Sequence, residues 1–221
     1  MQVFGQFIAT VGWLGLALVA SELGATLIHW LGQWVGFRLI GARIVRITGF
    51  RLQLSRVRGH WKLERPLTRH PHIVAAPPAD AKRFNHAIYC FGGGLFNLLT
   101  VMLSLITLNQ FKFSFDLWLF SFIIWIWVNT LKAAQLLPMN LHGYPTAGQE
   151  FRQARESTAA MTAAYVTACA AAVKVQTGSV RDLDASMIVM PRDGGNRNYL
   201  VVRQAWLILE WGLQHGLDLS L

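Results

Sequence analysis

The stretch Ala20-Ser21-Glu22-Leu23-Gly24-Ala25-Thr26-Leu27-Ile28 places a carboxylate in the middle of a long apolar segment. Between Val3 and Phe37, the only ionisable side chains are Glu22 and His29. A carboxylate at the centre of a membrane helix costs roughly 2.5–3.5 kcal/mol on insertion scales, so such a residue usually has a partner or a function. Glu22 is therefore the first candidate functional residue of this chain. If it is buried without a metal or a cation, Glu22→Gln should be nearly neutral for stability. A large loss of stability would instead indicate a charged partner such as Arg or Lys.

The composition predicts a membrane protein. Of the 221 residues, 53% are hydrophobic and only 14% are charged, which is too apolar for an ordinary soluble domain. Three segments, at about 3–37, 87–109 and 117–137, are long enough to cross the roughly 30 Å hydrocarbon layer as helices. Residues 157–173 are also uncharged, but they are mostly Ala and Thr. We expect them to form a cytoplasmic helix, with a fourth span as the alternative.

The distribution of charge predicts the orientation in the membrane. The net charge is +9, and residues 38–83 hold eleven Lys or Arg but only two acids, Glu64 and Asp80. Because basic loops stay in the cytoplasm, we expect the N-terminus outside and the C-terminus inside. Arginines beside a membrane usually meet lipid headgroups, so we expect the lipid bilayer as a partner and no nucleic acid.

Outside the apolar segments, the pattern predicts a small hairpin and a helical tail. Between Phe50 and Leu63, apolar and polar side chains alternate around Gly59, which is typical of a β-hairpin, expected at about 44–65. The prolines between His70 and Pro78 predict a loop. From 149 to 221 we expect a cytoplasmic helical tail. It ends in an amphipathic helix whose stripe should pack inward: Val202, Trp206, Leu209 and Leu213.

The segment around Glu22 has the frame of a metalloprotease helix without its ligands. In the motif His-Glu-x-x-His, two imidazoles on one helix face bind zinc, and the glutamate polarises the metal-bound water. The same frame here reads Ser21-Glu22-Leu23-Gly24-Ala25. The glutamate is present, but Ser and Ala stand at the two ligand positions.

With this frame, the chain resembles the site-2 protease family of intramembrane zinc metalloproteases, especially the small bacterial members that process peptides. That family carries His-Glu-Leu-Gly-His in its first core helix and then a hairpin. A glycine-rich second helix with an Asn follows, and the third helix ends in Asn-x-x-Pro before a downstream Asp-Gly. The matching segments here are Gly92-Gly93-Gly94 with Asn97, Gln135-Leu136-Leu137-Pro138, and residues 143–148. The resemblance implies an α-helical integral membrane protein with a three-span core in residues 1–148.

Every metal position departs from the family pattern. The resemblance puts the zinc ligands at Ser21, Ala25 and Ala147, and Gln135 replaces the family's Asn. A catalytic zinc normally has three protein ligands, so we expect no metal and no other cofactor, with zinc only under the alternative below. His29 and His142 are weak substitutes as ligands. Glu22 holds the general-base position but has no activated water to serve.

The resemblance also implies a peptide-binding cleft. Its expected lining is Glu22 together with Asn97, Gly93, Gly94, Pro138, Asn140 and Gly143. For the glycine row with Asn97, plain helix packing is the other interpretation, because small residues let helices approach closely in lipid. The segment from Pro138 to Gly148 is broken by two prolines and two glycines, and such backbone at membrane depth needs protein or a wet cavity around it.

These observations favour a catalytically degenerate relative, a pseudoprotease that binds or regulates a membrane peptide or a protein partner. The alternative is an active intramembrane zinc metalloprotease that processes a peptide, either with unconventional ligands or represented here by an inactivated variant. A third hypothesis is a structural subunit of a peptide export or immunity system, which predicts stable association with a partner.

Overall fold

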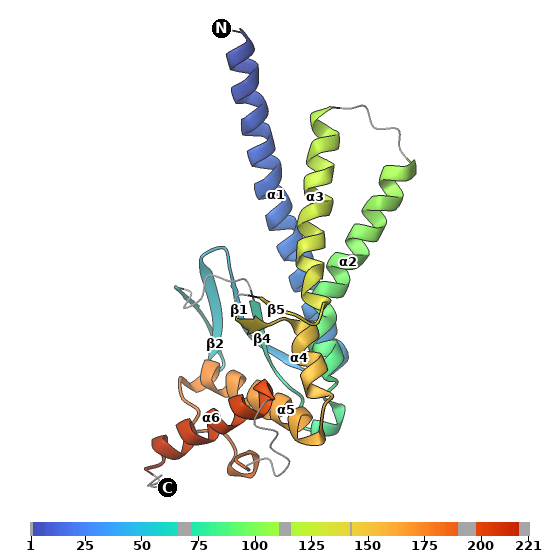
Figure 1. The fold of residues 1–221 in the computed structure, drawn as a ribbon. Helices are drawn as coiled ribbons and strands as arrows, with labels where there is room; N and C mark the ends of the chain where they lie inside the picture. Colours follow the sequence, from blue (N-terminus) through green and yellow to red (C-terminus); the bar gives the residue numbers. More distant parts are fainter. Residues whose placement is uncertain (1, 66–71, 111–115, 142, 190–197, 217–221) are drawn as a thin grey trace.

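Three long apolar helices and a small antiparallel sheet make up the first two thirds of the fold. The computed structural model describes residues 2–65, 72–110, 116–141, 143–189 and 198–216. The long helices are α1 (Gln2–Leu39), α2 (His86–Gln110) and α3 (Leu117–Ala133), and α3 continues as the 3₁₀ turn η2 (Ala134–Leu136). They pack on one another at one end and diverge toward the other, where the N-terminus lies (Figure 1).

The helices α1, α2 and α3 follow the predicted apolar segments closely. Asp116 caps the start of α3, because its carboxylate accepts hydrogen bonds from the backbone N–H groups of Trp118 and Leu119 at 3.0 and 3.2 Å. By length and composition, four helices among the described residues could cross a membrane: α1, α2, α3 and α5 (Thr158–Thr177). The prediction of a mostly helical membrane protein with a small antiparallel sheet is therefore confirmed.

The sheet has four strands where the sequence predicted two. Its strands are β1 (Arg43–Gly49), β2 (Leu52–Val57), β3 (His60–Glu64) and β4 (His72–Ala76), in the order β3-β2-β1-β4. The predicted glycine turn joins β2 to β3, with Gly59 at φ 87°. A second turn at Phe50 and Arg51, both at positive φ, interrupts what the alternation suggested was one strand.

The expectation of a loop between His70 and Pro78 is wrong for its central part. Residues 72–76 form β4, which pairs antiparallel with β1 over Arg43–Thr48. The run Ile73-Val74-Ala75 is too short to predict a strand among so many prolines. Its partner strand, β1, lies about 30 residues away in the chain. Residues 66–71, including His70, lie outside the described part of the chain.

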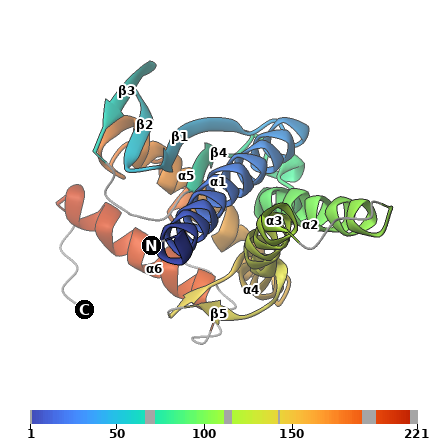
Figure 2. The same cartoon turned by 90° about the horizontal axis from the view of Figure 1, so that it is seen from above.

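The sheet lies between the end of the long helices and α5. On one face, Ile73 and Ala75 pack with Phe37 and Ile40 from the end of α1. On the other face, Val45 packs against α5 through Ala172 and Val175. Figure 2 shows the sheet extending sideways from α1, with β3 outermost.

The C-terminal part is helical, as expected, but its last helix presents a different face. It contains α4 (Ala147–Ala154), α5, the short turn η3 (Ala185–Met187) and α6 (Tyr199–Gln214). The prediction that the α6 stripe packs inward is wrong, because Trp206 is 69% exposed and Leu213 is 68% exposed. The helix instead buries Leu200, Val201, Gln204 and Leu207, a face about one residue away from the apolar stripe.

Candidate functional site

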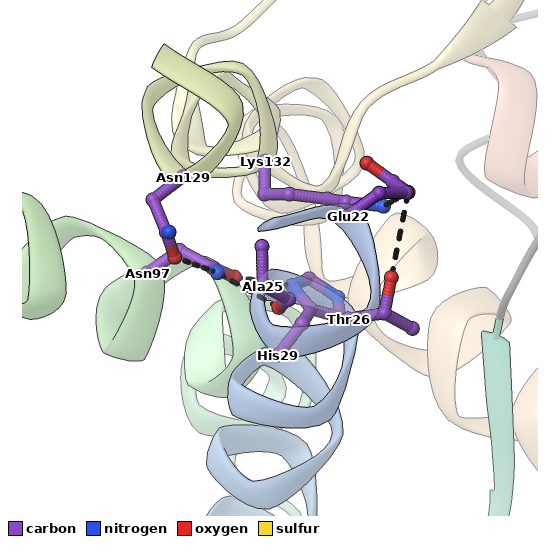
Figure 3. A network of polar contacts seen from close by, with 7 residues as sticks. All are labelled: Glu22, Ala25, Thr26, His29, Asn97, Asn129 and Lys132. Atoms are coloured by element: carbon purple, nitrogen blue, oxygen red, sulfur yellow. Dashed lines mark hydrogen bonds and ion pairs between the residues drawn. The ribbon is translucent and has the colours of Figure 1, made fainter. Parts of the chain in front are cut away.

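Glu22 has a cationic partner from a neighbouring helix. The ammonium group of Lys132 on α3 lies 2.5 Å from Glu22 Oε1, and the hydroxyl of Thr26 on α1 donates to the same oxygen at 3.4 Å (Figure 3). The Lys132 side chain is 18% exposed and that of Glu22 is 50% exposed. An ion pair between apolar helices lowers the cost of placing either charge in lipid. The charged partner of Glu22, which the sequence alone could not identify, is thus a lysine on α3.

The residues at the resemblance's metal positions do not fit a zinc ion. Ser21 and Ala25 are buried on α1, and Ala147 is the first residue of α4, which packs against α2, α5 and α6. A methyl group offers no lone pair, and the nearest carboxylate, Glu22, is held by an ammonium group that would repel a metal ion. Across the described ranges, no three His, Cys, Asp or Glu side chains gather as a metal-binding group.

His29 and Asn97 belong to a buried hydrogen-bond network that joins all three long helices. Asn97 on α2 is fully buried, and its side-chain N–H₂ donates to the carbonyl of Ala25 at 3.0 Å and to Asn129 Oδ1 at 2.9 Å. His29 Nδ1 lies 3.0 Å from Asn97 Oδ1, so that nitrogen carries the donated proton. The amide of Asn129 on α3 donates in turn to the carbonyl of Trp125 at 2.9 Å.

This network leaves Asn97 no free donor for a peptide. Both of its N–H groups and its carbonyl oxygen are engaged by the protein itself, as Figure 3 shows for the side chains around His29. The structure therefore brings Glu22, His29 and Asn97 near one another, but divides them between an ion pair and a helix-joining network. The substitute ligand His142 lies outside the described residues.

The glycines of α2 act as packing positions. A Cβ added at Gly93 would lie 2.5 Å from Cε1 and Nε2 of the His29 ring, and one at Gly94 would lie 2.7 Å from Leu136 Cδ2. Gly93 thus makes room for the imidazole that Asn97 holds. Gly93 and Gly94 are thus in close contact with α1 and η2. These contacts support the interpretation of the glycine row as helix packing.

The segment after α3 forms a short, exposed hairpin. Its strands are β5 (Asn140–Leu141) and β6 (Tyr144–Pro145), joined through Gly143 at φ 83°. The Thr146 hydroxyl lies 2.5 Å from the carbonyl of Leu137 and 2.9 Å from that of Met139, which closes the base of the hairpin. Pro138, Asn140 and Gly143 are exposed, whereas Asn97 is buried inside the helices. These predicted cleft residues therefore lie in different environments.

A groove between α1 and α3 was missed by sequence reasoning. It has a volume of about 420 Å³ and a mostly apolar lining that reaches Ser21 on α1. Three indole rings border it, those of Trp13, Trp118 and Trp125, and the N–H of Trp13 donates to Ser121 Oγ at 2.9 Å. The tryptophan-rich sequence of α3 was a signal for it, but the pairing with Trp13 depends on how the helices pack.

A second group that the sequence analysis passed over lies where α2 meets α4. His86 Nε2 is 3.3 Å from Cys90 Sγ, one helical turn away, and Glu150 of α4 packs beside them. Burial raises the pKa of Glu150, and the Arg203 guanidinium at 3.8 Å opposes that rise only in part. The spacing of four residues between His86 and Cys90 was visible in the sequence. The proximity of Glu150 was not.

Comparisons of the chain with protein-family models, with curated proteins and with solved structures give no match.

Proposed function

We propose that this chain is a non-catalytic membrane protein, with a core like that of the site-2 proteases, that binds an apolar membrane-embedded peptide or protein segment. The observation that carries the proposal is the ion pair between Glu22 and Lys132. Glu22 stands where the site-2 proteases have their general base, and its carboxylate is held by Lys132. Ser21 and Ala25 stand at two of the family's metal-ligand positions.

The ion pair changes what Glu22 does. A general base must accept a proton from water that a metal or a second group activates. Here the carboxylate accepts hydrogen bonds from an ammonium group and a hydroxyl, and its role is to join α1 to α3. The same three helices that position a protease site in the family would then form a binding scaffold.

The proposed arrangement in the membrane has three spans. The helices α1, α2 and α3 lie together, while the sheet separates the end of α1 from α5 (Figure 1). Because the sheet is rich in arginine, it would lie in the cytoplasm together with α5, which places the N-terminus outside. A bacterial plasma membrane is the location that the family resemblance favours.

The groove between α1 and α3 is the proposed binding surface. Its lining is mostly apolar and comes from residues 13–21 of α1 and 118–125 of α3. Tryptophan rings offer large contact areas at small entropic cost, which suits an apolar peptide segment. Ser121 holds the Trp13 ring in place through its hydrogen bond.

Two measurements test the proposal. A photo-crosslinking amino acid at Leu16, which lines the groove, should capture a membrane peptide or protein in native membranes. The same group at Leu103, equally apolar and 56% exposed on α2, should not. Equal capture at both positions would mean that the groove is not the binding surface.

Metal analysis of the purified full chain tests the absence of catalysis. We expect substoichiometric zinc and no cleavage of membrane peptides. Glu22→Gln should change neither the zinc content nor the cleavage result. Stoichiometric zinc, together with a cleavage activity that Glu22→Gln abolishes, would establish the protease alternative and overturn the proposal.

A further inference from the structure

Five arginines surround one large cavity at the base of α1. The cavity has a volume of about 1240 Å³ and lies between the end of α1, the sheet and the end of α5. Arg38 comes from α1, Arg43 from β1 and Arg56 from β2, and two more arginines stand near the β2–β3 turn and η1 (Ala81–Arg83): Arg58 and Arg83. Among the described residues that line it, Asp80 is the one acid.

One of these arginines already has a carboxylate partner, because Arg83 pairs with Asp80 at 3.8 Å. Arg58 lies in the β2–β3 turn near the end of α5, where its backbone N–H donates to the carbonyl of Gln176. It lines the large cavity but not the adjoining one described below, so the candidate site does not include it.

The other three guanidinium groups have no carboxylate partner among the described residues. Arg38 lies over the ring of Trp34, with its Cζ 5.5 Å from the ring centroid, and Arg56 Nε approaches the carbonyl of Gly59 at 3.5 Å. Arg38, Arg43 and Arg56 also line a second, adjoining cavity of about 480 Å³. Three like charges gathered around two cavities repel one another, and a bound anion would offset that repulsion.

Their position selects the kind of anion. The planar guanidinium group forms paired hydrogen bonds with phosphate oxygens. The second cavity is bordered by Trp34 and Trp61, which are 44% and 47% exposed, and tryptophan favours the membrane–water interface. Arg38 ends the apolar length of α1, so the three arginines lie at the level where a span leaves the hydrocarbon.

We propose that Arg38, Arg43 and Arg56 form a binding site for a phosphate-bearing anion. The phosphate group would lie between the three guanidinium groups, and the larger cavity would hold whatever is attached to it. Two sources offer this chemistry, an anionic lipid headgroup and a soluble phosphate compound. The site is separate from the groove between α1 and α3 and does not depend on peptide binding there.

The experiment uses the full chain in a neutral detergent. Calorimetric titration compares short-chain dioctanoyl phosphatidylglycerol, dioctanoyl phosphatidylcholine and inorganic pyrophosphate. We expect one of the two anionic probes to bind at least about tenfold more tightly than phosphatidylcholine, and its binding to weaken with added salt. Phosphatidylglycerol that pyrophosphate does not displace assigns a lipid; tighter binding of pyrophosphate assigns a soluble phosphate.

A matched pair of variants identifies the site. Arg43→Gln with Arg56→Gln should lower the affinity for the anionic probe at least about tenfold. Arg152→Gln with Arg155→Gln removes the same charge from exposed positions on and after α4 and should leave the affinity unchanged. Circular dichroism and the melting temperature show that each variant is folded. Equal binding of all three probes, or an equal loss in both variants, would overturn the proposal.

Discussion

Lys132 on α3 and Glu22 on α1 form an ion pair across the interface of two apolar helices. Glu22 is the one acid between Val3 and Phe37, and its partner comes from a segment more than 100 residues later. Each charge is costly in lipid alone, so each residue of the pair lowers the cost of the other.

This dependence predicts a strong coupling between the two substitutions. Lys132→Met leaves the Glu22 carboxylate without its cation, and we expect it to lower the free energy of unfolding by about 2–3 kcal/mol. The double variant Glu22→Gln with Lys132→Met should recover most of this loss, because no charge is left unpaired. Thermal unfolding in detergent measures both. Simple addition of the single effects would show that the pair does not hold the helices together.

The amide of Asn97 should contribute to stability through the helices that it joins. Asn97→Ala removes hydrogen bonds to His29, Ala25 and Asn129, and we expect a loss of about 1–2 kcal/mol, since such bonds in membranes are individually modest. Thr107→Val is the control on the same helix, because the Thr107 hydroxyl donates to the carbonyl of Leu103 in its own helix and, among the described residues, joins no other helix. If both variants melt alike, the network carries little stability.

The room that Gly93 leaves for His29 predicts a steric effect. Gly93→Ala brings a methyl group against the imidazole and should cost about 1–3 kcal/mol through overpacking. Gly12→Ala on α1 meets nothing within 4 Å and should leave stability unchanged or raise it. His29→Ala should relieve the Gly93→Ala variant. Failure of that rescue would place the strain elsewhere.

Glu150 should make stability depend on pH in a defined direction. Burial raises the pKa of its carboxyl group in the folded chain, so the folded state holds the proton more tightly than the unfolded state. The contribution of Glu150 to stability is then greatest at low pH and is lost as the pH rises from the unfolded carboxyl pKa of about 4.3 through the folded pKa.

Glu150→Gln should remove that fall. The variant should be at least as stable as the natural chain at neutral pH. The difference in stability between the two should shrink in acid, and melting temperatures measured from acidic to neutral pH follow it. Glu156→Gln, an exposed neighbour, should keep the pH dependence. A Glu150→Gln variant with the unchanged profile would assign the dependence to another group.

The long helices could be predicted from the sequence because their cause is local. Apolar length alone gives α1, α2 and α3 to within a few residues, and Gly59 between alternating strands gives the turn from β2 to β3. The strand β4 could not be predicted in the same way, since its pairing with β1 depends on contacts distant in the chain.

The contacts of the candidate site were also beyond the sequence pattern. The position of Glu22 in an apolar segment indicated that it has a partner or a function. That this partner is Lys132 depends on how α3 packs against α1. Asn97 was expected either in a cleft lining or in helix packing, and its hydrogen bonds to Ala25 of α1 and Asn129 of α3 depend on how the three helices meet. The prediction that the apolar stripe of α6 packs inward was wrong, because amphipathic spacing alone does not determine which helix face contacts the rest of the protein.

The position of the sheet constrains the order in which the chain can be assembled. Val45 of β1 is covered by Ala172 and Val175 of α5, which a ribosome makes more than 120 residues later. Until then, one side of the sheet stays bare, although α1, α2 and α3 have already been synthesised. A nascent chain that stops before Thr158 would therefore expose the apolar side of the sheet, which makes it prone to aggregation and a substrate for chaperones.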